Sequence, residues 1–283
     1  MQPQRLRLRG ADGLWLAADA RGDPSAPSVL FLHGGGQTRH SWGGTAELLA
    51  SRGRYTLALD MRGHGESDWS TERRYTVGDF AADMFAVIAT LEQPPVVVGA
   101  SLGGMAALLG IGEAEDPRVS GIVLVDISTS IDPAGADRIK TWMFSRPDGF
   151  ASLDEVADAI AEYTRDRTRA RNLKGLEKNV RLGADGRYRW HWDPGFMNGK
   201  AGPGEINDQP RMLRAARRLR VPALLVRGQK SDVINPENAR EFLGAAPGAE
   251  FVDVAGAGHM VAGDRNDAFS EAVREFLERR IPL

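Results

Sequence analysis

One serine stands among small residues in a stretch whose pattern predicts a sharp turn. Residues 96–98 are all valine and predict a strand, Gly99-Ala100-Ser101-Leu102-Gly103 follows, and the apolar residues 105–109 predict a buried helix. Such a turn has no room for a Cβ two residues before and after the serine, where Gly99 and Gly103 stand. It would lift the Ser101 hydroxyl clear of the sheet and aim the backbone N–H of Leu102 at a reacting atom. A capping serine in a structural turn has the same local pattern, so the rest of the chain must decide.

An acid and a histidine follow later predicted strands. Asp232 comes after a strand that ends near residue 226, and His259 comes after one that ends near residue 254. A serine hydroxyl needs a base to attack, and imidazole is the side chain suited to that work near neutral pH. We expect His259 to take the proton of Ser101, and Asp232 to hold the other ring nitrogen.

A second acid leaves the choice of carboxylate open. Asp126 also ends a predicted strand, 120–125, and could replace Asp232 as the partner of His259. If it does not, it is expected to cap the strand or to lie at the floor of a substrate pocket. Because residues at the carboxyl ends of parallel strands converge, both acids can reach the same site.

A glycine run supplies the expected oxyanion donors. His33-Gly34-Gly35-Gly36 follows predicted strand 28–32, and we expect the backbone N–H groups of Gly35 and Leu102 to stabilise an oxyanion. His33, Gly34 and Gly36 are further candidates for the pocket, although His33 and His64 are better suited to hydrogen bonding with the backbone. Neither His40 nor His191 has a second ligand at metal spacing, so no metal is expected, and the chemistry needs no cofactor.

The elements that must position these residues alternate between strand and helix. Short, nearly continuous apolar runs predict strands inside a sheet that helices cover on both faces, which is a mostly parallel α/β sheet. The expected strands are 5–9, 14–20, 28–32, 55–59, 96–98, 120–125, 221–226 and 250–254, and the expected helices are 41–52, 76–91, 236–243 and 268–280.

The alternation stops between residues 128 and 218. This stretch is charged and aromatic, with one amphipathic helix expected at 154–164, and it predicts a helical cap (lid) inserted into a core domain of residues 1–127 and 219–283. Its aromatic residues either line a substrate pocket or form the small core of the cap. Arginines at positions 165, 167, 169 and 171 favour a solvated helix face. The candidate pocket residues here and beside His259 are Trp142, Trp190, Trp192, Phe196 and Met260.

The composition limits the classes of partner. The 283 residues carry a net charge of −2, 42% hydrophobic and 26% charged residues, and no cysteine. This charge favours neither nucleic acid nor a membrane surface as a partner, and the lack of cysteine excludes a disulfide or a thiolate site. No apolar run approaches the roughly 20 residues that span a bilayer, and the first residues lack a signal-peptide pattern. We expect a soluble, cytoplasmic protein of unknown oligomeric state.

Together these motifs resemble the α/β-hydrolase family. The resemblance rests on the glycine run after His33, on Asp60-Met61-Arg62-Gly63-His64-Gly65-Glu66-Ser67, on the turn around Ser101, and on Gly258-His259 with Asp232 before it. It implies an eight-stranded, mostly parallel sheet with a cap between the sixth and seventh strands. It also implies that Ser101, Asp232 and His259 are the catalytic residues.

The resulting expectation is a serine hydrolase that cleaves carboxylic esters of small hydrophobic substrates through an acyl-enzyme. A C–C bond hydrolase, a lactonase or a cofactor-free perhydrolase would use the same three residues. A ligand-binding receptor that keeps the fold without the chemistry is an alternative of another class. Fold alone does not choose among them.

Overall fold

The computed structural model describes residues 2–163, 172–196, 208–264 and 266–283. Eight of its strands form one sheet: β1 (Gln4–Arg9), β2 (Trp15–Arg21), β3 (Ser28–Leu32), β4 (Tyr55–Leu59), β5 (Val96–Ala100), β6 (Gly121–Val125), β9 (Ala223–Gly228) and β10 (Glu250–Val254). The helices of the core are η1 (Arg39–Trp42), α1 (Gly43–Ser51), α2 (Val77–Ile88), α3 (Leu102–Glu113), α6 (Gln209–Arg217), α7 (Pro236–Ala245), α8 (Val261–Asp264) and α9 (Asn266–Arg280).

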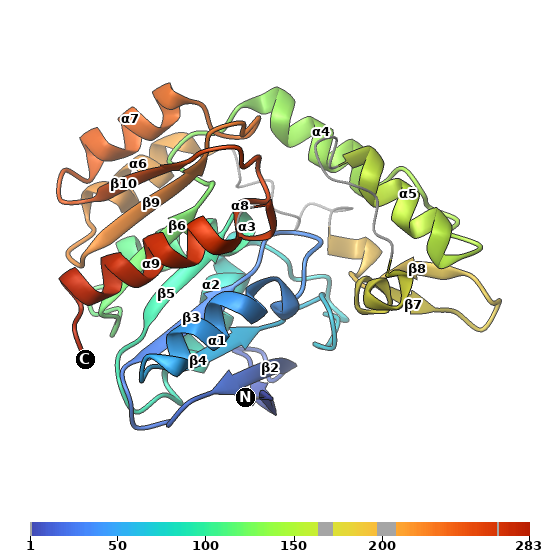
Figure 1. Ribbon diagram of the computed structural model, residues 1–283, viewed down its shortest axis with the longest axis horizontal. Coiled ribbons are helices and arrows are strands. Elements are labelled where there is room, and N and C mark those ends of the chain that lie inside the picture. Colours follow the sequence, from blue (N-terminus) through green and yellow to red (C-terminus); the bar gives the residue numbers. More distant parts are fainter. Residues whose placement is uncertain (1, 164–171, 197–207, 265) are drawn as a thin grey trace.

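The sheet is mostly parallel, as the alternation of elements predicts. Its strand order is β1-β2-β4-β3-β5-β6-β9-β10, and only the pairs β1–β2 and β2–β4 are antiparallel. Helices α1 and α9 lie on one face of the sheet, and α2, α3 and α6 lie on the other (Figure 1). Because β4, β3, β5, β6, β9 and β10 run in one direction, their carboxyl ends meet at one edge, where ligands bind in such folds.

Two hydrophobic clusters fill the space between the sheet and these helices. Alternate residues of one strand enter different clusters: Val96 and Val98 of β5 pack toward α1 and α9, whereas Val97 packs toward α2 and α3. All three valines are fully buried. A strand with both faces covered in this way is apolar at every position, which is why the central strands read as continuous hydrophobic runs.

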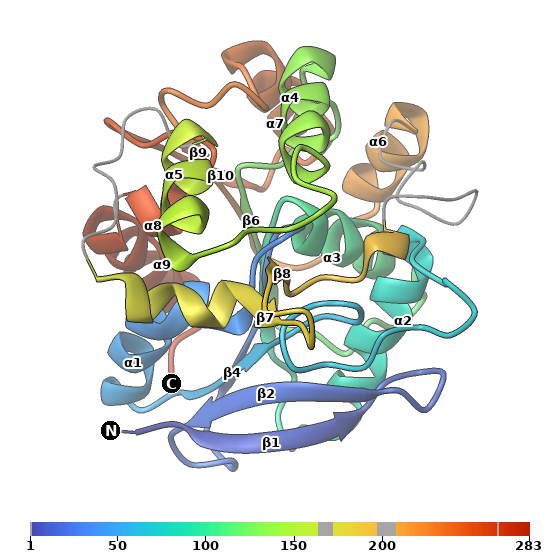
Figure 2. The same cartoon turned by 90° about the vertical axis from the view of Figure 1, so that its right-hand side faces the viewer.

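The insertion over the sheet contains more than helices. It holds α4 (Pro133–Met143), α5 (Leu153–Tyr163), the short helices η2 (Leu173–Asn179) and η3 (Pro194–Phe196), and a two-stranded ribbon of β7 (Val180–Leu182) and β8 (Tyr188–Trp190). Figure 2 shows α4 and α5 on the side of the molecule opposite β1 and β2. The ribbon was not predicted, because strands of three residues carry too little alternation to be recognised.

Helix α6 is placed differently from the rest of the predicted insertion. It packs on α3 of the core, where Ala215 lies so close that a Cβ at Gly112 would be 2.4 Å from its carbonyl oxygen. Its residues Met212, Ala215 and Ala216 are buried, and Ala215 lies against α3. The arginines at positions 165 to 171 lie outside the described residues. No helix in the described part of the chain is long and apolar enough to cross a membrane.

Candidate active site

The turn between β5 and α3 has the geometry that its glycines predict. Ser101 has a φ of 45°, a strained left-handed conformation for a residue with a side chain. A Cβ at Gly103 would lie 2.4 Å from the carbonyl oxygen of Leu32, and one at Gly99 would lie 2.6 Å from the backbone of Gly103. Strained backbone of this kind gathers at functional sites, where the surrounding structure supports it.

A carboxylate holds the imidazole of His259 in one orientation. The ring nitrogen Nδ1 of His259 donates a hydrogen bond of 2.7 Å to Oδ2 of Asp126, whose side chain is completely buried. Asp126 also accepts hydrogen bonds from the backbone N–H of Gly228, at 2.9 Å, and from the hydroxyl of Ser231. With Nδ1–H donating to Asp126, the proton of a neutral His259 ring is on Nδ1, and Nε2 carries the lone pair.

The expected pairing of Asp232 with His259 is therefore wrong in this structure. Asp232 points outward to Arg138 of α4, with an oxygen to nitrogen distance of 2.6 Å, and about half of its side chain is exposed. The loop after β9 turns at Gly228, whose carbonyl oxygen accepts from the N–H of Ser231. This turn directs Ser231 inward to Asp126 and leaves the next residue, Asp232, outside.

Asp126 shares a feature with Ser101. Its φ is 48°, so it too occupies the left-handed region, directly after β6. Aspartate and asparagine enter this region more readily than other side chains. The two strained residues thus stand at the carboxyl ends of the neighbouring strands β5 and β6, on the same edge of the sheet.

The glycine run lies beside the serine. A Cβ at Gly34 would be 3.3 Å from the Cβ of Ser101. Among the described residues, the N–H groups of Gly35 and Leu102 have no hydrogen-bond acceptor. Gln37 closes the loop, because its side chain accepts from the N–H of Gly34 and donates to the sulfur of Met260.

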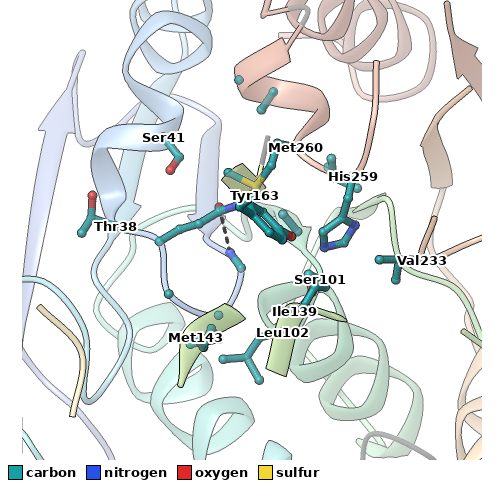
Figure 3. Close-up of a pocket in the computed structure, with 18 of the residues that line it drawn as sticks. Thr38, Ser41, Ser101, Leu102, Ile139, Met143, Tyr163, Val233, His259 and Met260 are labelled. Atoms are coloured by element: carbon teal, nitrogen blue, oxygen red, sulfur yellow. Dashed lines mark hydrogen bonds between the residues drawn. The ribbon is translucent and has the colours of Figure 1, made fainter. Parts of the chain in front are cut away.

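A cavity of about 400 Å³ opens above Ser101 and His259. Its walls come from the ends of the sheet strands and from the insertion, and Figure 3 shows Ser101 and His259 on one side of the view and the hydroxyl-bearing Thr38 and Ser41 on the other. The apolar part of the lining includes Met105, Ile127, Ile131, Ala136, Ile139, Met143, Ile160, Tyr163 and Val233. Most of these residues from the cap lie on α4 and α5, whose sequences alone do not reveal which face points to the cavity.

The predicted pocket residues divide into two groups. Those that line the cavity are Gly34, Gly36, Trp142, Trp190, Phe196 and Met260. The others, His33, Asp126 and Trp192, stand behind it. Trp192 stacks on Trp190, with ring centroids 4.9 Å apart, so the aromatic residues of the insertion form both a small core and a pocket wall.

Three further histidines are buried around the glycine run and serve the backbone. His33, His64 and His191 are at most 2% exposed, and each of their ring nitrogens makes a hydrogen bond to a backbone group. Burial lowers the pKa of His33 to about 4 and that of His64 to about 3, and it also lowers the pKa of His191. In the described part of the chain, no group of three acidic or histidine side chains could hold a metal ion.

The fold and this site define a class of protein. A family model described as the alpha/beta hydrolase fold matches residues 27–265. The chain belongs to the α/β-hydrolase family.

Relatives within this family are hydrolases. The esterase Rv0045c of Mycobacterium tuberculosis is 29% identical over 266 residues, which cover 90% of this chain and 84% of the esterase. The 3-hydroxybutyrate-oligomer hydrolase of Cupriavidus necator is 29% identical over 254 residues, 84% of each chain. A crystal structure of an alpha/beta hydrolase from Novosphingobium aromaticivorans superposes with a TM-score of 0.81 at 26% identity, covering 98% of this chain and 99% of that one.

Proposed function

We propose that this protein is a serine hydrolase that cleaves carboxylic esters of small, largely apolar substrates through an acyl-enzyme. The observation that carries the proposal is Ser101 on its strained turn beside His259, which Asp126 orients, at the foot of an apolar cavity. The relatedness to an esterase and to an oligoester hydrolase supports the same chemistry.

The same groups act in both halves of the reaction, and His259 takes up and gives back one proton in each half. Nε2 of His259 takes the proton of the Ser101 hydroxyl as its oxygen attacks the ester carbonyl, and Asp126 stabilises the imidazolium that forms. The N–H groups of Gly35 and Leu102 donate to the oxyanion, and the leaving alcohol takes the proton back from His259. His259 then takes a proton from a water molecule that attacks the acyl-enzyme, and it returns this proton to the oxygen of Ser101 as the acid is released.

The cavity limits the size and character of the ester. Its volume of about 400 Å³ lies near the lower end of the roughly 300–1,000 Å³ that small-molecule sites occupy. The aliphatic and aromatic lining favours an apolar acyl or alcohol group. We expect turnover of p-nitrophenyl esters to be highest for short and medium acyl chains and to fall for palmitate.

Replacement of the proposed nucleophile tests the reaction. Ser101→Ala should abolish turnover of p-nitrophenyl butyrate, because it removes the hydroxyl that forms the proposed acyl-enzyme, and it should leave the circular dichroism spectrum unchanged. Ser25→Ala, in the exposed loop between β2 and β3, is the matched control and should retain full activity.

A covalent probe separates an enzyme from a receptor with the same fold. A fluorophosphonate should label the natural protein and not Ser101→Ala. Undiminished ester turnover by Ser101→Ala would overturn the proposed nucleophile. Failure of the natural protein to react with the probe would instead favour a ligand-binding protein that has lost the chemistry.

A further inference from the structure

The loop that carries Gly35 is surrounded by buried histidines. We call residues His33–Gln37 the oxyanion loop, because Gly35 is the proposed donor. The loop includes Gly36 at a φ of 74°, a conformation that glycine adopts freely and that does not by itself fix the chain. The direction of the Gly35 N–H therefore depends on what holds the neighbouring peptide groups.

Two of the histidines come from the core. His33 accepts from the N–H of Met61 through Nε2, at 3.0 Å, so its Nδ1 carries the proton and donates to the carbonyl of Gly34, at 2.8 Å. That carbonyl belongs to the same peptide group as the Gly35 N–H. The next peptide is held by His64, whose Nε2 accepts from the N–H of Gly36 at 3.1 Å.

The third histidine comes from the cap. His191 lies between β8 and η3, and its Nδ1 accepts from the N–H of Gly65 at 2.8 Å. Its Nε2 therefore carries the proton and donates to the carbonyl of Gly36 at 3.2 Å. Three consecutive peptide groups of the oxyanion loop are thus each held by one histidine. Of these histidines, His191 comes from the cap and the other two come from the core.

The segment around His191 is itself docked on the core. Its neighbour Asp193 donates its N–H to the carbonyl of Gly63, at 2.8 Å, and its carboxylate accepts from the hydroxyl of Tyr75. The ring of Phe196 lies over the oxyanion loop, since its nearest atoms would be 3.6 Å from a Cβ at Gly35. These contacts fix the position of His191 relative to the oxyanion loop.

We propose that His191 is a positioning residue through which the docked cap holds the oxyanion loop, and with it the Gly35 N–H, in the orientation needed for catalysis. This inference rests on the proposed function, because it concerns the donor of the oxyanion. The cap would then do more than form a pocket wall, because its docking on the core would also position the oxyanion loop.

The chemistry of the pairings requires neutral rings. Each histidine accepts a hydrogen bond from a backbone N–H with one ring nitrogen and donates one to a backbone carbonyl with the other. The carbonyl that His64 donates to belongs to Arg62, which lies outside the loop. Protonation would place two hydrogens face to face at the accepting nitrogen. Burial favours the neutral form of all three rings, in agreement with these bonds.

Three variants of His191 separate its two hydrogen bonds. The amide nitrogen of glutamine lies near the place of Nε2, so His191→Gln keeps the donation to Gly36. The shorter amide of asparagine lies near Nδ1, so His191→Asn keeps only the acceptance from Gly65. His191→Ala removes both.

Arg181→Gln serves as the matched control. Arg181, on β7, reaches from the cap to the carbonyl of Gly65 and does not touch the oxyanion loop. The Arg181→Gln substitution should therefore weaken the docking of the cap at a neighbouring point and leave the contacts of the oxyanion loop in place.

We expect His191→Ala and His191→Asn to lower kcat for p-nitrophenyl butyrate about ten- to a hundredfold, because displacement of a catalytic group by about 1 Å can cost that much. KM should change less than about threefold. A boronic acid forms a tetrahedral adduct with Ser101, and its inhibition constant should rise by the same factor by which kcat/KM falls. His191→Gln and Arg181→Gln should stay close to the natural protein in both measurements.

Hydrogen exchange gives a readout that does not need activity. Amides of residues 33–37 should exchange faster in His191→Ala than in Arg181→Gln. Equal effects of the alanine and control variants on kcat and on exchange would overturn the proposal, as would an unchanged loop in His191→Ala. A natural protein without ester turnover, together with faster exchange in His191→Ala, would instead overturn the proposed function and leave the bracing of the loop supported.

Discussion

At the scale of single residues, the site depends on which carboxylate faces His259. Asp126 is fully buried, and its carboxylate accepts hydrogen bonds from Gly228, Ser231 and His259. These donors stabilise the buried negative charge beside the imidazole of His259. Asp232 is half exposed and paired with Arg138, and such surface pairs contribute about 0 to 1 kcal/mol. The two acids therefore have separate roles, and substitution distinguishes them.

Asparagine at the two positions gives opposite results in this view. Asp126→Asn should lower kcat of ester hydrolysis by about ten-thousandfold, since an amide at this place favours the wrong tautomer of the imidazole. Asn tolerates the positive φ of residue 126, so the fold should persist. Asp232→Asn should stay within a few-fold of the natural protein. A large loss for Asp232→Asn with little for Asp126→Asn, measured on p-nitrophenyl butyrate, would reverse the assignment.

At the scale of elements, the turn between β5 and α3 is held by close packing of backbone. Gly103 approaches the end of β3, and Gly99 approaches the start of α3, at distances that exclude a side chain. The helix and the two strands can therefore lie close together, which places the N-terminus of α3 beside the oxyanion loop. The position of Ser101 is thus set by three elements that are far apart in sequence.

Alanine substitution measures how much this packing matters. Gly103→Ala would place a Cβ 2.4 Å from the carbonyl oxygen of Leu32, and we expect it to lower the free energy of unfolding by about 1–3 kcal/mol or more. Gly244→Ala in α7 meets no atom within 4 Å and should be neutral or stabilising by up to about 1 kcal/mol. Urea denaturation of the two variants checks this, and equal stabilities would show that the turn can relax around an added methyl group.

At the scale of the whole molecule, the insertion over the sheet and the loops at the strand ends share a buried polar network. His33 and His64 of the core and His191 of the cap are neutral in the folded protein, and their neighbours include Arg39 beside His33 and Arg181 beside His191, whose charges further disfavour protonation. In an unfolded chain these histidines would titrate near pH 6.5. Folding is therefore linked to pH.

The sign of this linkage follows from the lowered pKa values. The unfolded chain binds protons as pH falls below about 6.5, while the folded rings stay neutral until about pH 4 for His33 and about pH 3 for His64. Stability should be fully present above pH 6.5 and should fall toward pH 4, with His33 alone contributing as much as about 3 kcal/mol. Urea denaturation between pH 7 and pH 4 measures the loss.

Removal of one titrating ring provides the control for this dependence. His191→Gln should show a shallower fall in the free energy of unfolding over the same pH range, because glutamine binds no proton. A stability that stays flat between pH 6.5 and pH 4 in the natural protein would contradict the neutral state of the buried histidines.

Much of this architecture could be predicted from local sequence. The strand–helix alternation and the continuous apolar runs define a doubly covered parallel sheet, and the glycines around Ser101 predict the sharp turn that the structure shows there. The family membership agrees with both. The interpretation of His33 and His64 as backbone partners also agrees with the hydrogen bonds of the structure. These features depend on residue type and near spacing, which the sequence contains.

The choice between Asp126 and Asp232, the lining of the cavity by α4 and α5, and the reach of His191 to Gly36 were decided only by the tertiary structure. The choice between the two acids depends on whether Ser231 or Asp232 faces inward in the loop after β9. The two residues are adjacent in the sequence, and residue type alone does not predict which of them points to Asp126. The other two depend on how a cap distant in sequence docks on the core. Sequence by itself determined the fold and the sharp turn that carries Ser101, and the packing of distant segments decided what surrounds that turn, because contacts between distant segments leave no local pattern.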